Sequence, residues 1–171
     1  IGIGIDFKDG DLALRGNFAT LDNEGKIIDR RAGRKIERED VEEISKEIEK
    51  EIKFSSPNAS VVVAPTVGHR VTVRLRDSKP LSSEISNTDP AYGRVDGMGI
   101  AKAVSDFMKI EKCIPLEQTE NAISAANLVN EFTEQSLEIM KKSDVNKRRS
   151  QKNKKLLNSI LLRDAGNKYP N

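Results

Sequence analysis

Residues 11–34, DLALRGNFATLDNEGKIIDRRAGR, decide the fold because they predict a β-hairpin. The DNEG segment at residues 22–25 is typical of a turn, since its glycine readily adopts a positive φ. The second run, residues 26–34, ends in three arginines around an Ala-Gly step. The first run alternates, which predicts an apolar face and a polar face. The apolar face holds Leu12, Leu14 and Phe18, and the polar face holds Arg15 and Asn17.

The hairpin is rich in groups that bind anions. Arginine donates a planar fork of hydrogen bonds to phosphate or carboxylate, and strands hold such groups more rigidly than loops do. The alternative is a half-exposed hairpin whose arginines are only solvated, and periodicity alone favours that alternative. The candidates for a shared anion site are Arg15, Asn17, Arg30, Arg31 and Arg34.

The rest of the chain predicts an α+β fold with a mostly antiparallel sheet of about five strands and two long helices on one face. Apolar residues recur at spacings of three and four in residues 38–54 and 119–142, which predicts helices, with Thr119 as an N-cap. Further strands are expected at residues 60–67, 69–77 and 156–163. Residues 81–99 are expected to form a long loop, and residues 98–111 have weak helical spacing.

Bulk properties exclude several classes of function. The net charge of +2 gives no global nucleic-acid signal, and a single histidine excludes histidine-rich metal chemistry within the chain. One cysteine cannot form an internal disulfide, which fits the reducing cytoplasm. No segment has the pattern of a signal peptide or a membrane span. The chain begins at Ile1 without a methionine, which suggests a domain excised from a longer protein.

Three further polar features have open interpretations. The strand at residues 69–77 alternates, and we expect Arg74 and Arg76 to face solvent or acidic partners rather than a substrate. Residues 144–155 are strongly basic, but without interleaved aromatic residues a solvated helix or loop is favoured over a nucleic-acid patch. Asp89 precedes a proline, where it would either orient an arginine or a substrate hydroxyl, or cap the turn.

Several short motifs occur in the order in which one enzyme family has them. They are RGNFAT at 15–20, DRRAGR at 29–34, GHR at 68–70, TDP at 88–90, AANLVNEF at 125–132, VN at 145–146 with Arg148 and Arg149, and LLRDAG at 161–166. Together they span nearly the whole chain, which resembles archaeal-type 2,3-bisphosphoglycerate-independent phosphoglycerate mutases of the alkaline phosphatase superfamily. Two positions depart from the family pattern, because Asp164 stands where glycine is usual and Ala91 where histidine is usual.

The resemblance implies a function that the residues alone do not give. Residues 1–171 would be a single insertion domain that binds phosphoglycerate, with the phosphatase domain of the same chain lying on both sides. The intact enzyme would interconvert 3-phosphoglycerate and 2-phosphoglycerate in glycolysis and gluconeogenesis. A serine and two divalent metal ions (Mn, Mg, Co or Zn) on the other domain would act in the transfer. The fragment alone would be inactive, and neither nucleic acid nor a membrane would be a partner.

The resemblance also extends the set of candidate substrate contacts. It favours His69 and Arg70, and an open sheet face is expected to carry Arg15, Asn17, Arg31, Arg70 and Arg163. With the hairpin candidates and Asp89, the set is Arg15, Asn17, Arg30, Arg31, Arg34, His69, Arg70, Asp89 and Arg163. The alternative function is a non-catalytic RNA- or protein-binding module that uses the basic strand and residues 147–155. A related phosphomutase or phosphatase with a different alcohol substrate is a third possibility.

Overall fold

The fold is an antiparallel five-stranded sheet with helices on one face, as the sequence predicts. The computed structural model describes residues 5–33, 35–95, 98–101 and 108–168. Strand β1 lies at the centre, between β4 and β7, and its end also pairs with β2, while β3 forms an edge beside β4. The strands of this sheet are β1 (Leu12–Leu21), β2 (Ile27–Asp29), β3 (Ser60–Pro65), β4 (Arg70–Arg76) and β7 (Ser159–Gly166).

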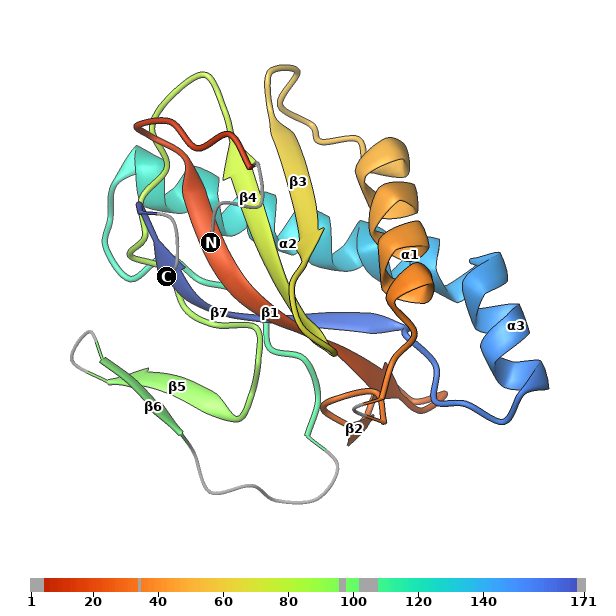
Figure 1. Cartoon of the computed structure of the whole chain (residues 1–171). Coiled ribbons are helices and arrows are strands. Elements are labelled where there is room, and N and C mark those ends of the chain that lie inside the picture. Colours follow the sequence, from red (N-terminus) through yellow and green to blue (C-terminus); the bar gives the residue numbers. More distant parts are fainter. Residues whose placement is uncertain (1–4, 34, 96–97, 102–107, 169–171) are drawn as a thin grey trace.

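Three helices accompany the sheet: α1 (Arg38–Glu51), α2 (Glu120–Lys141) and α3 (Asp144–Gln151). Helix α2 crosses behind β1, β4 and β3, and α1 lies beside β3 (Figure 1). The predicted cap of α2 is confirmed, since Thr119 Oγ1 accepts a hydrogen bond of 3.2 Å from the Ala122 backbone N–H. None of the described helices combines the length and the apolar character that a membrane crossing requires.

The core lies between the helices and the face of the sheet predicted to be apolar. Leu12, Leu14 and Phe18 of β1 are buried in one cluster with side chains of α1 and α2. Gly16 shares that face, and a Cβ there would come within 3.1 Å of side-chain carbons of Val71 and Leu162 from the two flanking strands. Glycine at this position therefore lets core side chains from both neighbours close over β1.

The hairpin turn forms as predicted, but its second strand is shorter than predicted. Asp22 anchors the turn, with its N–H donating to the Lys26 carbonyl over 2.8 Å, and Gly25 has a φ of +82°. Strand β2 ends at Asp29 because that carboxylate accepts backbone hydrogen bonds from Arg31 and Gly33 and so bends the chain away. The residues that follow β2 form a tight turn in place of the predicted continuation of the strand.

The weak helical spacing of residues 98–111 does not produce a helix where the structure describes that segment. Strand β6 (Met98–Ala101) pairs antiparallel with β5 (Tyr92–Val95) in a separate two-stranded sheet. Gly99 weakens any helix here, whereas a hairpin tolerates it. The loop predicted for residues 81–99 therefore contains a strand, while residues 102–107 lie outside the described part of the chain.

Candidate functional site

Four of the predicted residues share the sheet face that lies away from α1 and α2. The alternation of β1 directs Arg15 and Asn17 to this face, because Leu12, Leu14 and Phe18 occupy the opposite one. Asn17 lies opposite Arg70 of β4, and Arg15 lies opposite Arg163 of β7. Side chains directly opposite one another in antiparallel strands have Cβ atoms about 5 Å apart. The sheet therefore brings residues from three strands into one patch: Arg15, Asn17, Arg70 and Arg163, here called the open face.

A second group adjoins the open face through Arg163. The guanidinium of Arg163 lies over the ring of Tyr92 with its Cζ 4.8 Å from the ring centroid, and Arg30 lies over the same ring at 5.6 Å. Arg30 also forms an ion pair with Asp89, whose side chain is fully buried. Arg30, Asp89 and Arg163 are thus brought together, although they are far apart in the sequence.

The loop that carries Asp89 is fastened to β7. The backbone N–H groups of Thr88 and Asp89 both donate to the Leu162 carbonyl, at 3.0 and 3.1 Å, and Leu162 N–H donates to Thr88 Oγ1 at 2.9 Å. Asp89 Oδ1 accepts from the Ala91 N–H at 3.0 Å, while Oδ2 accepts from Arg30. Asp89 therefore performs two of the roles left open by the sequence, because it caps its turn and orients an arginine.

Three buried polar atoms of these groups have no hydrogen-bond partner in the part of the chain that the structure describes. They are Asn17 Oδ1, Arg30 Nε and Arg163 Nε. An unpaired polar atom in a buried position costs about 1–3 kcal/mol. Such atoms are exceptional in native proteins, and each calls for a partner such as water, an ion or a ligand. The three together offer two N–H donors and one acceptor.

Two of the remaining predicted residues, Arg31 and His69, are located by backbone hydrogen bonds. Arg31 is exposed in the turn after β2, and its backbone N–H is tied to Asp29 at 2.8 Å. His69 precedes β4, and its carbonyl accepts from the Phe18 N–H at 2.7 Å, which holds it beside β1. Arg34 lies outside the described residues.

The sequence did not identify Tyr92 and did not explain the departure at Asp164. Asp164 has a φ of +56°, a left-handed conformation that glycine adopts freely and aspartate tolerates better than most residues. It sits where the pairing of β7 with β1 is irregular, and its carboxylate accepts from Arg163 at 2.7 Å. The backbone conformation therefore explains why glycine is usual at position 164 in the family that the motifs resemble. The aspartate found here adds a hydrogen-bond partner for Arg163.

Most cations of the basic segment at residues 144–155 are paired with nearby carboxylates. Arg149 is 2 % exposed and donates to Glu37 and Asp40 at 2.9 Å each, and Arg148 pairs with Asp40 and Glu43. The hydrogen bond from Lys154, together with smaller contributions that include Arg149, lowers the pKa of Glu37 to about 2. These residues, here called the clamp, join α3 to the start of α1.

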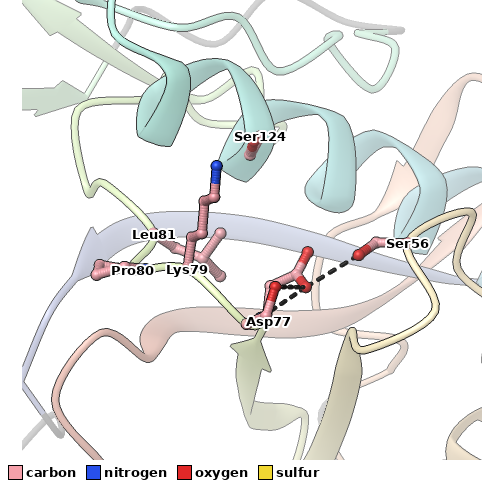
Figure 2. A pocket seen from close by; sticks show the side chains of 7 residues that line it. Ser56, Asp77, Lys79, Pro80, Leu81 and Ser124 are labelled. Carbon is pink, nitrogen blue, oxygen red and sulfur yellow. Dashed lines mark hydrogen bonds between the residues drawn. The ribbon is translucent and has the colours of Figure 1, made fainter.

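A small pocket lies at the other end of β4 from Arg70. It is lined by Ser56, Asp77, Ser78, Lys79, Pro80, Leu81 and Ser124 (Figure 2). Asp77 Oδ1 accepts from Ser56 Oγ at 2.9 Å and from the Ser78 N–H at 2.7 Å, so this carboxylate oxygen is already engaged. No group of three or more His, Cys, Asp or Glu residues within the described ranges is arranged to hold a metal ion. The open face is therefore the better candidate for an anionic ligand.

Comparison with known proteins agrees with the motifs. The family model described as 2,3-bisphosphoglycerate-independent phosphoglycerate mutase matches residues 1–146. The mutase of that name from Aeropyrum pernix is 39% identical over 168 residues, and one from Archaeoglobus fulgidus is 36% identical over 170. Each alignment covers 96% of this chain but only 39% and 36% of the relative. A solved cofactor-independent phosphoglycerate mutase from Thermoplasma acidophilum has a TM-score of 0.77 and 29% identity, over 96% of this chain and 39% of that one.

Proposed function

The chain belongs to the 2,3-bisphosphoglycerate-independent phosphoglycerate mutase family, and from that premise we propose that it is the substrate-binding domain of such an enzyme. The chain spans about two fifths of the length of the curated relatives that it matches, so the catalytic activity is proposed for a longer protein. In that protein the domain would act as a lid, holding phosphoglycerate while its phosphoryl group moves between the two hydroxyls.

The single observation that supports this role is the pairing of Asn17 with Arg70 and of Arg15 with Arg163 across the open face. Phosphoglycerate carries a carboxylate and a phosphoryl group, and arginine binds both with paired hydrogen bonds. Arg30 Nε and Arg163 Nε, which have no partner in the described part of the chain, are donors that such a ligand would satisfy. The buried Asn17 Oδ1 is an acceptor, and a glycerate hydroxyl is the matching donor.

Retention of the glycerate is what separates a mutase from a phosphatase. If the glycerate left before the second transfer, the phosphoryl group would pass to water instead. A domain that grips both anionic ends and covers them keeps the intermediate product in place. We propose that the transferring serine and the two divalent metal ions reside in the remainder of the longer protein, and that this chain supplies binding, orientation and exclusion of water.

The RNA- or protein-binding alternative has weaker support because most of its basic segment is paired. Lys147 lies 3.3 Å from Asp144, and the arginines of the clamp are bound to carboxylates of α1. Titration of the chain distinguishes the two functions. We expect weak, saturable binding of 3-phosphoglycerate and no retention of RNA. RNA binding that weakens steeply as salt rises would support the alternative instead.

Substitution of Arg31 tests the proposed function in the longer protein. Arg31→Ala should collapse mutase turnover while the metal content stays unchanged, because the residue would touch only the substrate. Lys35→Ala, two residues beyond the turn, is the matched control and should retain turnover. Normal turnover in the Arg31 variant would remove that residue from the site. A different phosphorylated alcohol, tested as substrate in the same assay, separates the mutase from a related phosphomutase.

A further inference from the structure

We propose that Tyr92 is a positioning residue of the substrate site, whose ring gathers Arg30 and Arg163 beside the open face. The inference rests on the proposed function and deepens it, because it adds a residue that belongs to no motif of the chain. The Cζ atoms of Arg30 and Arg163 lie 5.6 and 4.8 Å from the ring centroid. Both distances are within the range in which a cation is attracted by an aromatic ring.

The ring contacts arginines from two different parts of the chain. Arg30 follows β2, and Arg163 lies on β7. Two guanidiniums placed close together repel each other, and each therefore needs a neighbouring negative charge. Arg30 donates to Asp89 and Arg163 donates to Asp164, and the shared ring adds a negative surface between these two ion pairs.

The backbone of Tyr92 is fixed to the same part of β7. Its N–H donates to the Asp89 carbonyl at 3.2 Å, and its carbonyl accepts from Asn87 Nδ2 at 3.3 Å. Asn87 Oδ1 in turn accepts from the Asp164 N–H at 3.2 Å. The ring is thereby held in register with Arg163, which is the arrangement a positioning residue requires.

The two ion pairs use only one end of each guanidinium. Arg30 uses Nη2 and Arg163 uses Nη1 for their carboxylates, while both Nε atoms are buried and have no partner among the described residues. The ring and the two carboxylates thus hold the arginines without consuming these donors. A phosphorylated carboxylic acid is the class of ligand that two such donors, next to Arg15 and Asn17, would bind.

Kinetics of the longer protein with Tyr92→Leu and Tyr92→Phe test the ring itself. Leucine is apolar but lacks the ring, so we expect KM for phosphoglycerate to rise about tenfold, with a much smaller change in kcat. Phenylalanine keeps the ring and should stay within about twofold of the original KM. A structural role alone would not produce this rescue by phenylalanine together with a selective rise in KM.

Two further variants keep the outcome decisive. Tyr92→Met is a second non-aromatic side chain of similar reach, to be used if leucine prevents folding, and thermal unfolding reports whether each variant is folded. An unchanged KM in folded Tyr92→Leu or Tyr92→Met, or equal damage by phenylalanine, would overturn the proposal. Arg163→Ala separates this failure from that of the proposed function. If Arg163→Ala raises KM and the Tyr92 variants do not, only the role of the ring is lost.

Discussion

The open face and the clamp are both rich in arginine, but each arginine of the clamp pairs with two carboxylates, whereas Arg163 of the open face pairs with Asp164. Arg148 and Arg149 share the carboxylates of Glu37, Asp40 and Glu43. On the open face, Arg70 is exposed and none of the ion pairs among the described residues involves it. The open face and the clamp both gather several arginine side chains. The presence of acidic partners in space is what separates a structural cluster from a candidate anion site.

The two regions also differ in what they stabilise. The clamp lies between helices, where Arg149 Nε additionally donates to the Lys155 carbonyl at 2.6 Å, so all of its contacts are internal. The open face and the adjoining Arg30 hold two donors and one acceptor that are buried and have no partner among the described residues, which costs folding free energy unless a ligand binds. We therefore expect substitutions in the clamp to affect stability, and substitutions on the open face to affect activity.

Removing two cations from the open face should give the largest effect. In the longer protein, Arg15→Ala combined with Arg70→Ala is expected to lower mutase turnover on the order of 10³-fold, because charge-assisted donors to the substrate and transition state are lost. Steady-state kinetics measure the loss. The matched control combines Lys147→Ala with Arg148→Ala, which removes two paired cations and should leave turnover within about twofold. Equal losses in both double variants would abolish the distinction between the regions.

The clamp should respond in the opposite way. Arg149→Met is expected to lower the free energy of unfolding of the chain by about 3 kcal/mol, since Asp40 would keep a buried charge with one partner fewer. Urea denaturation measures this loss. The control is Lys152→Met on the exposed end of the same helix, with an expected change within about 0.5 kcal/mol. A stability like that of the control would show that the clamp contributes little.

Local periodicity predicted most of the framework on which these regions lie. The alternation of residues 12–18 and the helical spacing of residues 38–54 are strong local signals, and both elements form with the predicted faces. The polar face of β1 followed from the same alternation, so Arg15 and Asn17 could be placed together. Their partners Arg70 and Arg163 were proposed as well, but the register that joins them depends on the turns and bulges of the whole sheet.

The remaining features depend on contacts that no local pattern records. Arg149 is buried against Glu37, a carboxylate partner that lies 112 residues away in the sequence. No local pattern could therefore predict its burial. Tyr92 carries no periodic or motif signal, and only the folded chain shows that two arginines lie over its ring. Strand β6 formed in a segment with weak helical spacing because pairing with β5 outweighed that spacing. Contacts between residues far apart in the sequence, such as ion pairs and strand pairing, therefore determine these features.

Lowering the pH should remove the stabilisation that the ion pairs of the clamp contribute. The pKa of Glu37 is lowered to about 2, so its ion pairs stabilise the fold above the ordinary value near 4.5 and are lost as the pH falls toward 2. Glu37→Gln should therefore have a lower Tm than the unsubstituted chain at pH 7, and the gap should close by about pH 2. Thermal unfolding at several pH values measures the gap. Glu138→Gln, on the exposed face of α2, should show no such pH-dependent gap.

The smallest effect should come from two arginines on the same face of β4. Arg70→Thr removes a cation from the neighbourhood of Arg15 and adds a β-branched side chain, which should raise the free energy of unfolding by about 0.5 kcal/mol. Arg76→Thr is the matched contrast, because Arg76 donates to Asp11 at 2.8 and 2.7 Å.

Asp11 makes that contrast informative. Burial raises its pKa, but hydrogen bonds from Arg76 and from the Lys8 N–H outweigh this and hold the pKa below its usual value. Loss of Arg76 would leave a buried carboxylate with fewer donors, so Arg76→Thr should lower stability while Arg70→Thr raises it. Urea midpoints of the two variants give the signs directly. Opposite signs from one substitution at two ends of one strand would indicate that Arg70 is kept for binding at the expense of stability, and a loss of stability in both would argue that it serves the fold.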